Sequence, residues 1–355
     1  MVGLYIGSTT GYSGKNLLAM AMGLKFRKEG YKVGYMKPVG AVPHMSDNLP
    51  GDADATFIQG VLGLDQNPQK VTPVLVTRDF TIKAFSEDTG DLMPDIAEAY
   101  AELSEDKDIM IIGGSGSYLS SGTYCGVSGP AVCRTLGAKT ILVDRYNNNE
   151  LRYDYVLRTK ADLGDDLLGV VFNDVPEHYM DELKEVIVPF LERRGVKVLG
   201  VIPRDPLMGA IKVSDLAERL FGKIISAHAK VDRVVENFLI GTMQVENFMT
   251  HFRRHKNSAV IVGGDRADVQ LVALEGNCPC LILTGNLYPN DIILTRSEVL
   301  EIPVIVVRDD TFTVAKKMEA IQDSYKLRDM IKINHGAELV NAELDYEYIN
   351  EKLGL

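Results

Sequence analysis

The chain begins with a stretch that combines an apolar strand with a glycine-rich loop: Gly3-Leu4-Tyr5-Ile6-Gly7-Ser8-Thr9-Thr10-Gly11-Tyr12-Ser13-Gly14-Lys15-Asn16. Its apolar start predicts a short buried strand, and the loop that follows ends in Gly14-Lys15. Residues 17–30 predict a buried helix that closes at Gly30 in a left-handed conformation. Strand, loop and helix therefore come in the order that phosphate-binding loops use.

The loop offers the groups that an anion needs. Glycines let backbone N–H groups turn toward a phosphate, the helix N-terminus adds a positive partial charge, and Lys15 supplies a point charge for the distal phosphates. The expected phosphate-binding residues are Gly11, Ser13, Gly14, Lys15 and Asn16. The alternative is an ordinary strand-turn-helix corner in which the glycines serve only the geometry.

The loop departs from the usual pattern G-x-x-x-x-G-K-[ST] at two positions. Thr9 stands where the first glycine is expected, with Gly7 and Gly11 on either side. Asn16 stands where Ser or Thr normally offers a hydroxyl to magnesium. An amide oxygen is a poorer magnesium ligand, so the motif predicts phosphate binding with reduced support for the metal.

Size and charge limit the class of protein. A length of 355 residues exceeds what one core usually supports and predicts two domains, and the apolar share of 46% is ordinary for a globular chain. The formal net charge of -11 argues against a nucleic-acid or anionic-membrane surface. We find no apolar run of membrane-spanning length and no signal-peptide core, and expect a cytoplasmic protein with four reduced, mostly buried cysteines.

Short apolar strands alternate with helices along the whole chain, which predicts an α/β fold with a parallel sheet covered on both faces. In the first half the strands are expected at 31–36, 109–112, 140–144, 167–174 and 196–203, with a helix at 180–194. In the second half we expect helices at 213–220, 267–275 and 311–325, a strand-like segment at 239–246, and strands at 259–262, 280–283 and 303–307. Three strand-and-helix units would give the second domain its own small core.

The first 205 residues resemble dethiobiotin synthetase and the related N-terminal domain of long phosphotransacetylases. The matching pieces are the Gly14-Lys15 loop, the segments 34–39, 169–175 and 199–203, and Ala53-Asp54-Ala55 with Gln59. The resemblance implies a P-loop domain that binds ATP or another adenine nucleotide. It implies that Asp54 faces magnesium, Lys37 reaches the reacting group, Asn173 reads the adenine edge, and Pro203 belongs to the nucleotide site.

The same comparison shows where this chain differs from the synthetase. That enzyme carries Glu-Gly-Ala-Gly-Gly where this chain has residues 113–117, Gly-Gly-Ser-Gly-Ser, so a metal-binding carboxylate is missing at Gly113. With Asn16, two of the three expected magnesium supports are altered. Because magnesium stabilises the charge that develops in phosphoryl transfer, such a site is expected to bind a nucleotide and turn it over slowly or not at all.

The second half resembles the domain named for an Asp-Arg-Thr-Gly-Gly motif, which occurs in long phosphotransacetylases and some regulated pyrophosphatases. Residues 264–268, Gly-Asp-Arg-Ala-Asp, are the local counterpart, without the Thr-Gly-Gly portion. Candidate ligand residues are Asp265, Arg266, Thr284 and Gly285. Arg266 meets either an anion or a neighbouring acid in a salt bridge.

The sequence leaves three functions open. The first is a regulatory module that binds an adenine nucleotide at Lys15 and signals to a partner, such as an enzyme of acetyl-CoA or acetate metabolism. The second is an ATP-dependent ligase of the dethiobiotin synthetase type, and the third is phosphate acetyltransferase activity. We expect domains at 1–206 and 207–330, a helical tail at 331–355 whose part from Ala337 to Leu355 is a packing or partner helix, and, by analogy, a homo-oligomer.

Overall fold

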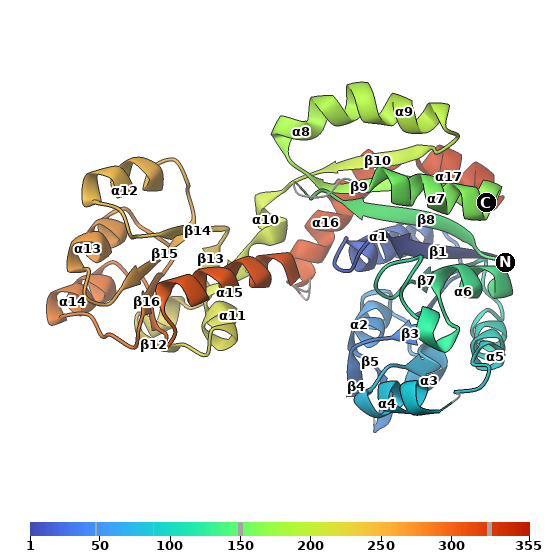
Figure 1. The fold of residues 1–355 in the computed structure, drawn as a ribbon, viewed down its shortest axis with the longest axis horizontal. Helices are drawn as coiled ribbons and strands as arrows, with labels where there is room; N and C mark the ends of the chain where they lie inside the picture. Colours follow the sequence, from blue (N-terminus) through green and yellow to red (C-terminus); the bar gives the residue numbers. More distant parts are fainter. Residues whose placement is uncertain (47, 88, 148–151, 325–328) are drawn as a thin grey trace. The chain divides into compact units, whose positions relative to one another are not determined.

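The computed structural model describes residues 1–46, 48–87, 89–147, 152–324 and 329–355 (Figure 1). The chain forms two compact units, one made of Met1–Arg204 with Leu327–Leu355 and the other of Asp205–Lys326. The chain therefore passes from the first unit to the second close to the expected boundary at 206. The segment 331–355, expected as a separate tail, belongs to the first unit.

The first unit contains a six-stranded sheet in which all neighbouring strands are parallel. Its order is β10 (Val198–Pro203), β9 (Leu167–Val175), β8 (Lys139–Arg145), β1 (Val2–Ser8), β7 (Ile109–Gly113) and β2 (Val33–Met36). Two strand pairs lie beside it, β3 (Val39–Gly40) with β6 (Val74–Leu75) and β4 (Pro43–Ser46) with β5 (Leu49–Asp52). The carboxyl ends of parallel strands share one edge of a sheet, which brings the loops after β1, β2 and β7 together.

Every residue of β7 is buried, as are the last six of β1, which is why these strands are continuous apolar runs. The helices of this unit are α1 (Lys15–Lys28), α2 (Ala53–Val61), α3 (Pro68–Val71), α4 (Arg78–Ser86), α5 (Met93–Leu103), α6 (Gly129–Leu136), α7 (Tyr153–Leu163), α8 (Glu177–Glu182), α9 (Val188–Arg193), α16 (Met330–Glu343) and α17 (Tyr346–Leu353). The predicted parallel α/β architecture is confirmed. Gly30 has φ +98°, the left-handed conformation expected after the first helix.

The C-terminal helices complete the first unit. Helix α16 packs against α1 and β10, and its apolar side chains belong to the same core as the sheet. The ring of Tyr346 meets the edge of Phe26 at a centroid distance of 6.2 Å, and the ammonium of Lys25 lies 4.8 Å from the Tyr346 ring centroid. In this unit the tail is a packing element.

The second unit has a five-stranded sheet of order β12 (Lys223–Ser226), β17 (Val304–Val306), β16 (Leu281–Thr284), β15 (Ser258–Gly263) and β14 (Asn237–Ile240). Four of these strands run parallel, and the edge strand β12 is antiparallel to β17. The pair β11 (Ile211–Lys212) and β13 (Val234–Val235) lies beside it, with helices α10 (Pro206–Gly209), α11 (Val213–Arg219), α12 (Val245–Phe252), α13 (Ala267–Glu275), α14 (Asp291–Val299) and α15 (Thr311–Ser324). Alternate residues of β15 enter two separate clusters, Ala259 and Ile261 in one and Val260 and Val262 in the other, so the sheet is buried on both faces.

Three sequence predictions need correction. The segment 239–246 is the end of β14, a turn and the start of α12, because the apolar run at 238–240 is too short to extend the strand through Gly241. The second sheet contains an edge strand that was not expected, β12, which runs antiparallel to β17. The helix expected at 180–194 is interrupted by a π-helical turn at Leu183–Ile187 ahead of Pro189, whose missing N–H cannot continue the regular ladder. The expected helix 311–325 is α15, and position 325 lies outside the described residues.

None of the described helices is long and apolar enough to cross a membrane.

Candidate functional site

The loop between β1 and α1 has the backbone geometry of an anion-binding turn. Gly14 is the N-cap of α1 with φ +104°, a conformation that favours glycine, and no side chain caps the N–H groups of the first helical turn. A Cβ at Gly14 would lie 2.3 Å from Nδ2 of Asn173, so the loop has no room for a side chain there. The uncapped N–H groups and the helix dipole favour an anion at this point.

Lys15 lies at the centre of the site. Its Nζ donates to Oγ of Ser8 at 2.7 Å and to the carbonyl oxygen of Gly116 at 2.9 Å. Only 8% of the residue is exposed. Burial, and next the nearby ammonium of Lys37, lower the pKa of Lys15 to about 8. Within the described part of the chain the amine is thus held by neutral oxygens, with the Asp54 carboxylate near enough to oppose the pKa shift but not in direct contact, an environment that an anionic ligand improves.

The other predicted phosphate-loop residues surround Lys15 with different roles. The hydroxyl of Ser13 is buried and donates to the carbonyl of Thr10 at 3.0 Å. Gly11 is exposed, with open space where a Cβ would point. Asn16 is half-buried in the first turn of α1. Ser13 and Asn16 thus lie at the helix start, while Gly11 lies on the outer part of the loop.

Asn173 and Pro203 lie on β9 and β10, the two strands at one edge of the sheet. Asn173 lies near the end of β9, and its Nδ2 donates to the carbonyl of Ser13 at 2.9 Å. Pro203 ends β10, the neighbouring strand. The structure therefore brings Asn173 to the phosphate loop, 160 residues away in sequence. Its expected contact with an adenine edge stays a prediction.

Lys37 lies just after β2 in a buried cluster with two acids. Its Nζ is 2.7 Å from Oδ1 of Asp52 and 3.6 Å from Oδ2 of Asp54. Oδ1 of Asp52 also accepts the N–H groups of Asp54 and Ala55 and so caps α2, and its Oδ2 accepts the N–H of Val42. Asp52 is therefore the capping acid of the pair, and the expected role of Asp54 toward magnesium stays a prediction.

Magnesium fits the residues of this site poorly. Of the three positions expected to support the metal, only Asp54 carries a carboxylate, since the other two hold Asn16 and Gly113. Asp52 already accepts four hydrogen bonds. Among the residues that the structure describes, there is no group of three or more His, Cys, Asp and Glu side chains that could hold a metal ion.

The candidate residues of the second unit lie at one edge of its sheet. Asp265 and Arg266 follow β15, and Thr284 and Gly285 lie at the end of the adjacent parallel strand β16. Thr284 is hydrogen-bonded to Thr311 through their Oγ1 atoms at 2.8 Å, and Gly285 has φ +74°. These residues occupy the edge where open parallel sheets bind ligands.

Arg266 makes a bidentate ion pair with a neighbouring acid. Its Nε and Nη2 lie 3.0 Å from Oδ1 and Oδ2 of Asp268, and its Nη2 also donates to the carbonyl of Met243. The salt-bridge alternative is therefore what the structure shows for this side chain. Asp265 is exposed and adds a negative charge beside it.

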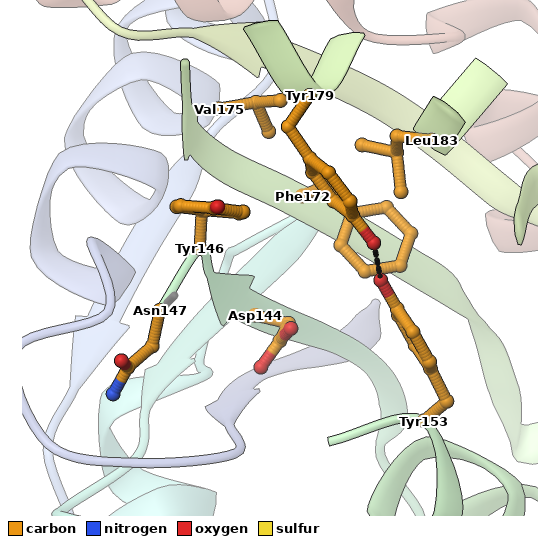
Figure 2. A pocket seen from close by; sticks show the side chains of 8 residues that line it. All are labelled: Asp144, Tyr146, Asn147, Tyr153, Phe172, Val175, Tyr179 and Leu183. Atoms are coloured by element: carbon orange, nitrogen blue, oxygen red, sulfur yellow. Dashed lines mark hydrogen bonds between the residues drawn. The ribbon is translucent and has the colours of Figure 1, made fainter. Parts of the chain in front are cut away.

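A small cavity lies at the carboxyl ends of β8 and β9 (Figure 2). It is lined by Asp144, Tyr146, Asn147, Tyr153, Phe172, Val175, Tyr179 and Leu183. The hydroxyls of Tyr153 and Tyr179 are hydrogen-bonded to each other at 2.5 Å, and the Asp144 carboxylate accepts a hydrogen bond from Thr9 of the phosphate loop. None of the residues predicted for nucleotide binding lines this cavity.

Sequence reasoning missed the groups that hold Lys15. Ser8 and the Gly116 carbonyl contact its amine, yet Ser8 reads as the last residue of a strand and Gly116 as part of a second glycine-rich turn. The sequence does show that the glycine-rich turn at 113–117 follows an apolar strand, as the phosphate loop does. That this strand, β7, pairs with β1, and that a backbone carbonyl of the turn contacts Lys15, could be seen only in the structure.

Comparison with known proteins supports both halves of the chain. A family model described as an AAA domain matches residues 2–212, and one described as a DRTGG domain matches residues 215–321. The phosphate acetyltransferase of Synechocystis sp. is 21% identical over 97% of this chain and 50% of its own length. The chain thus spans about half the length of that relative, in its N-terminal half.

Two further comparisons concern the separate domains. The dethiobiotin synthetase of Methanococcus vannielii is 25% identical over 55% of this chain and 90% of its own length. The CBS and DRTGG domains of a Clostridium perfringens pyrophosphatase, solved with the activator diadenosine tetraphosphate, are 20% identical over 33% of this chain and 49% of theirs, with a TM-score of 0.28. The sequence matches confirm the resemblance to a dethiobiotin synthetase-like domain followed by a DRTGG domain.

Proposed function

Since this chain belongs over residues 2–212 to the AAA domain family, we propose that it binds an adenine nucleotide at Lys15 and acts as a regulatory module with little or no ATP turnover. The observation that carries the proposal is the buried Lys15 amine, which lies behind the uncapped N-terminus of α1 without a carboxylate in contact. The loop supplies the donors for phosphates, and Asn173 beside Ser13 supplies an amide near the position expected for the base.

Weak turnover follows from the altered metal positions. Phosphoryl transfer requires the developing negative charge to be neutralised, which magnesium usually does. Of the three positions expected to support magnesium in this chain, only Asp54 carries a carboxylate. A site that holds its ligand without consuming it is suited to report nucleotide concentration. The relatives that match this chain over their N-terminal half point to an enzyme of acetyl-CoA or acetate metabolism as the partner, and the family analogy points to a homo-oligomer.

Calorimetric titration of the purified chain with ATP and ADP tests this proposal, together with a phosphate-release assay. We expect binding by the native chain, no detectable binding by Lys15→Ala, and release of phosphate far slower than the roughly 1–100 s⁻¹ typical of kinases. Lys139→Ala is the matched control, because Lys139 begins β8, at the end of the strand opposite to the site, and pairs there with Asp166. Equal affinity in Lys15→Ala and the native chain would refute the nucleotide site, and brisk hydrolysis would refute the regulatory role.

The second candidate function is an ATP-dependent ligase of the dethiobiotin synthetase type. It is favoured by Lys37, which lies within 3.6 Å of Asp54 and close enough to Lys15 to lower its pKa. Incubation with ATP, bicarbonate and a vicinal diamine distinguishes the two functions. Formation of a cyclic urea that is lost in Lys37→Ala supports the ligase, while nucleotide binding without product supports the regulatory module.

A further inference from the structure

A buried tyrosine lies where a metal-binding carboxylate would have to stand. Tyr35, on β2, has 0% exposure, and a Cβ placed on Gly113 would be 2.6 Å from its Oη and 3.3 Å from its Cζ. Real Cβ atoms do not approach other atoms so closely. With the Tyr35 ring in this position, a side chain at 113 would have to displace the phenol, so the packing disfavours a carboxylate there.

The Tyr35 hydroxyl has an unusual environment. It is buried and has no hydrogen-bond partner among the residues that the structure describes, a state that costs free energy unless a ligand or water supplies a partner. Burial raises its pKa, and the carboxylates of Asp52 and Asp54 raise it further, so the phenol remains a neutral donor. These two carboxylates also place the hydroxyl in the Lys37 cluster, at the shared carboxyl edge of β2 and β7.

Two ammonium groups lie in the same cluster. The proximity of Lys37 is the second cause, after burial, of the lowered pKa of Lys15. Lys37 pairs with Asp52 at 2.7 Å and with Asp54 at 3.6 Å, whereas Lys15 donates to neutral oxygens of the described residues and the Asp54 carboxylate acts on it without direct contact. Lys15 is therefore the ammonium of this cluster that has no carboxylate at ion-pair distance among the described residues, and a phosphate oxygen would complement it.

From this arrangement we infer that the Lys15 site takes its polyphosphate as the metal-free anion, with Lys15, Lys37 and the Tyr35 hydroxyl in place of a divalent cation. The inference rests on the proposed nucleotide binding and adds the form of the ligand that is bound. The pair Tyr35 and Gly113 determines this preference, because the phenol both excludes a carboxylate and offers a donor.

The test is a calorimetric titration of the full chain with ATP in two buffers, one with EDTA and one with excess magnesium. We expect affinities in the two buffers to agree within about threefold, which is about 0.65 kcal/mol. Binding that is at least about tenfold tighter with magnesium would overturn the inference and leave the proposed function standing. Absence of binding in both buffers would instead refute the proposed function.

Two variants test the role of the tyrosine. Tyr35→Phe removes the hydroxyl and keeps the ring, and is expected to weaken binding in EDTA about tenfold, since a charged phosphate oxygen would lose a hydrogen-bond donor. Tyr100→Phe is the matched control, because its hydroxyl also lies 2.6 Å from the Cβ position of a glycine, Gly3, at the opposite end of β1. Its affinity should equal that of the native chain. An unchanged affinity in Tyr35→Phe would refute the role of the hydroxyl.

The double variant Tyr35→Phe/Gly113→Glu tests the exclusion itself. Removing Oη leaves Cζ, at 3.3 Å from the Cβ position, as the nearest atom, which small shifts accommodate. We expect this variant to bind ATP at least about tenfold more tightly with magnesium than with EDTA, because the restored carboxylate adds a metal ligand. Gly113→Glu alone should lower the melting temperature through its clash with Tyr35. If the double variant folds but binds ATP equally well with magnesium and with EDTA, the inference is contradicted.

Discussion

At the scale of single residues, the site depends on how a buried amine keeps its proton. Lys15 is enclosed by Ser8 and Gly116, and burial disfavours its charged form. An unperturbed lysine has a pKa near 10.4, so the folded protein holds this proton much less firmly than the unfolded chain. A bound phosphate reverses the shift, because an opposite charge favours the ammonium. The proposed nucleotide binding would therefore be accompanied by proton uptake at this residue.

This linkage predicts that nucleotide affinity falls in alkaline solution. Below pH 8 Lys15 is already protonated in the free protein, and above it a growing share is neutral and must take up a proton to bind. The dissociation constant should therefore rise as the pH rises through about 8, approaching tenfold per pH unit. Titration calorimetry from pH 7 to 9 measures this slope. Lys15→Arg, whose guanidinium stays charged, should give a flat profile over the same range, and a flat profile for the native chain would contradict the assignment.

Single residues also show what the sequence could reveal of the site. The position of Lys15 at the start of a helix was predictable, because Gly-Lys follows an apolar strand and a glycine-rich loop. The burial of Tyr35 against Gly113 was not, since it requires the register of β2 on β7. The missing carboxylate was visible in the sequence, whereas the atom that excludes it was visible only in the fold.

At the scale of elements, the C-terminal helix α16 is as much part of the nucleotide domain as the strands. It packs on α1, the helix that presents the phosphate loop, and contributes Ile333 and Val340, both 0% exposed, to the core of the sheet. Packing of α16 on α1 fixes the position of the helix that carries the glycine-rich loop at its N-terminus. The sequence indicated a packing or partner helix here and could not say what it would pack on, because the contact joins segments near the two ends of the chain.

We predict that Ile333→Ala destabilises the first unit by about 2–5 kcal/mol, since the removed side chain is fully buried and leaves a cavity. Ile331→Ala, two residues earlier on the same helix, should change the stability by less than about 0.5 kcal/mol, because that side chain is 73% exposed. Chemical denaturation followed by circular dichroism compares the two variants. Equal effects would show that α16 does not hold the position that the structure gives it.

The elements of the second unit show which parts of a fold a sequence reveals. The runs at 259–262 and 280–283 are continuous and apolar because β15 and β16 are central, and both were predicted. Strand β12 is an edge strand with an exposed Lys223, and it was missed because its pattern resembles a loop. Central strands are thus fixed by burial on two faces, and edge strands by pairing that no local pattern records.

At the scale of the whole molecule, the sequence of the second unit interrupts that of the first, and each unit has its own hydrophobic core. All members of the two clusters that form the core of the second unit lie within residues 205–326. The core of the first unit draws on both ends of the chain, including Ile333, Val340, Leu344, Ile349 and Leu353. The second unit is therefore an insertion within the first, and the two should respond differently to truncation.

The interleaving predicts which fragments fold. Residues 205–326 expressed alone should unfold cooperatively, because they keep their entire core. Residues 1–204 alone should not fold stably: they lose five large apolar side chains, each stabilising by about 2 kcal/mol, and the sum of about 10 kcal/mol matches the whole stability of a typical domain. Joining 1–204 to 329–355 through a flexible glycine-serine linker should restore both cooperative unfolding and nucleotide binding. Calorimetric scans of the three proteins measure the unfolding transition of each and its shift by ATP. A 1–204 fragment that unfolds cooperatively and is stabilised by ATP would show that the C-terminal helices are dispensable to the first unit.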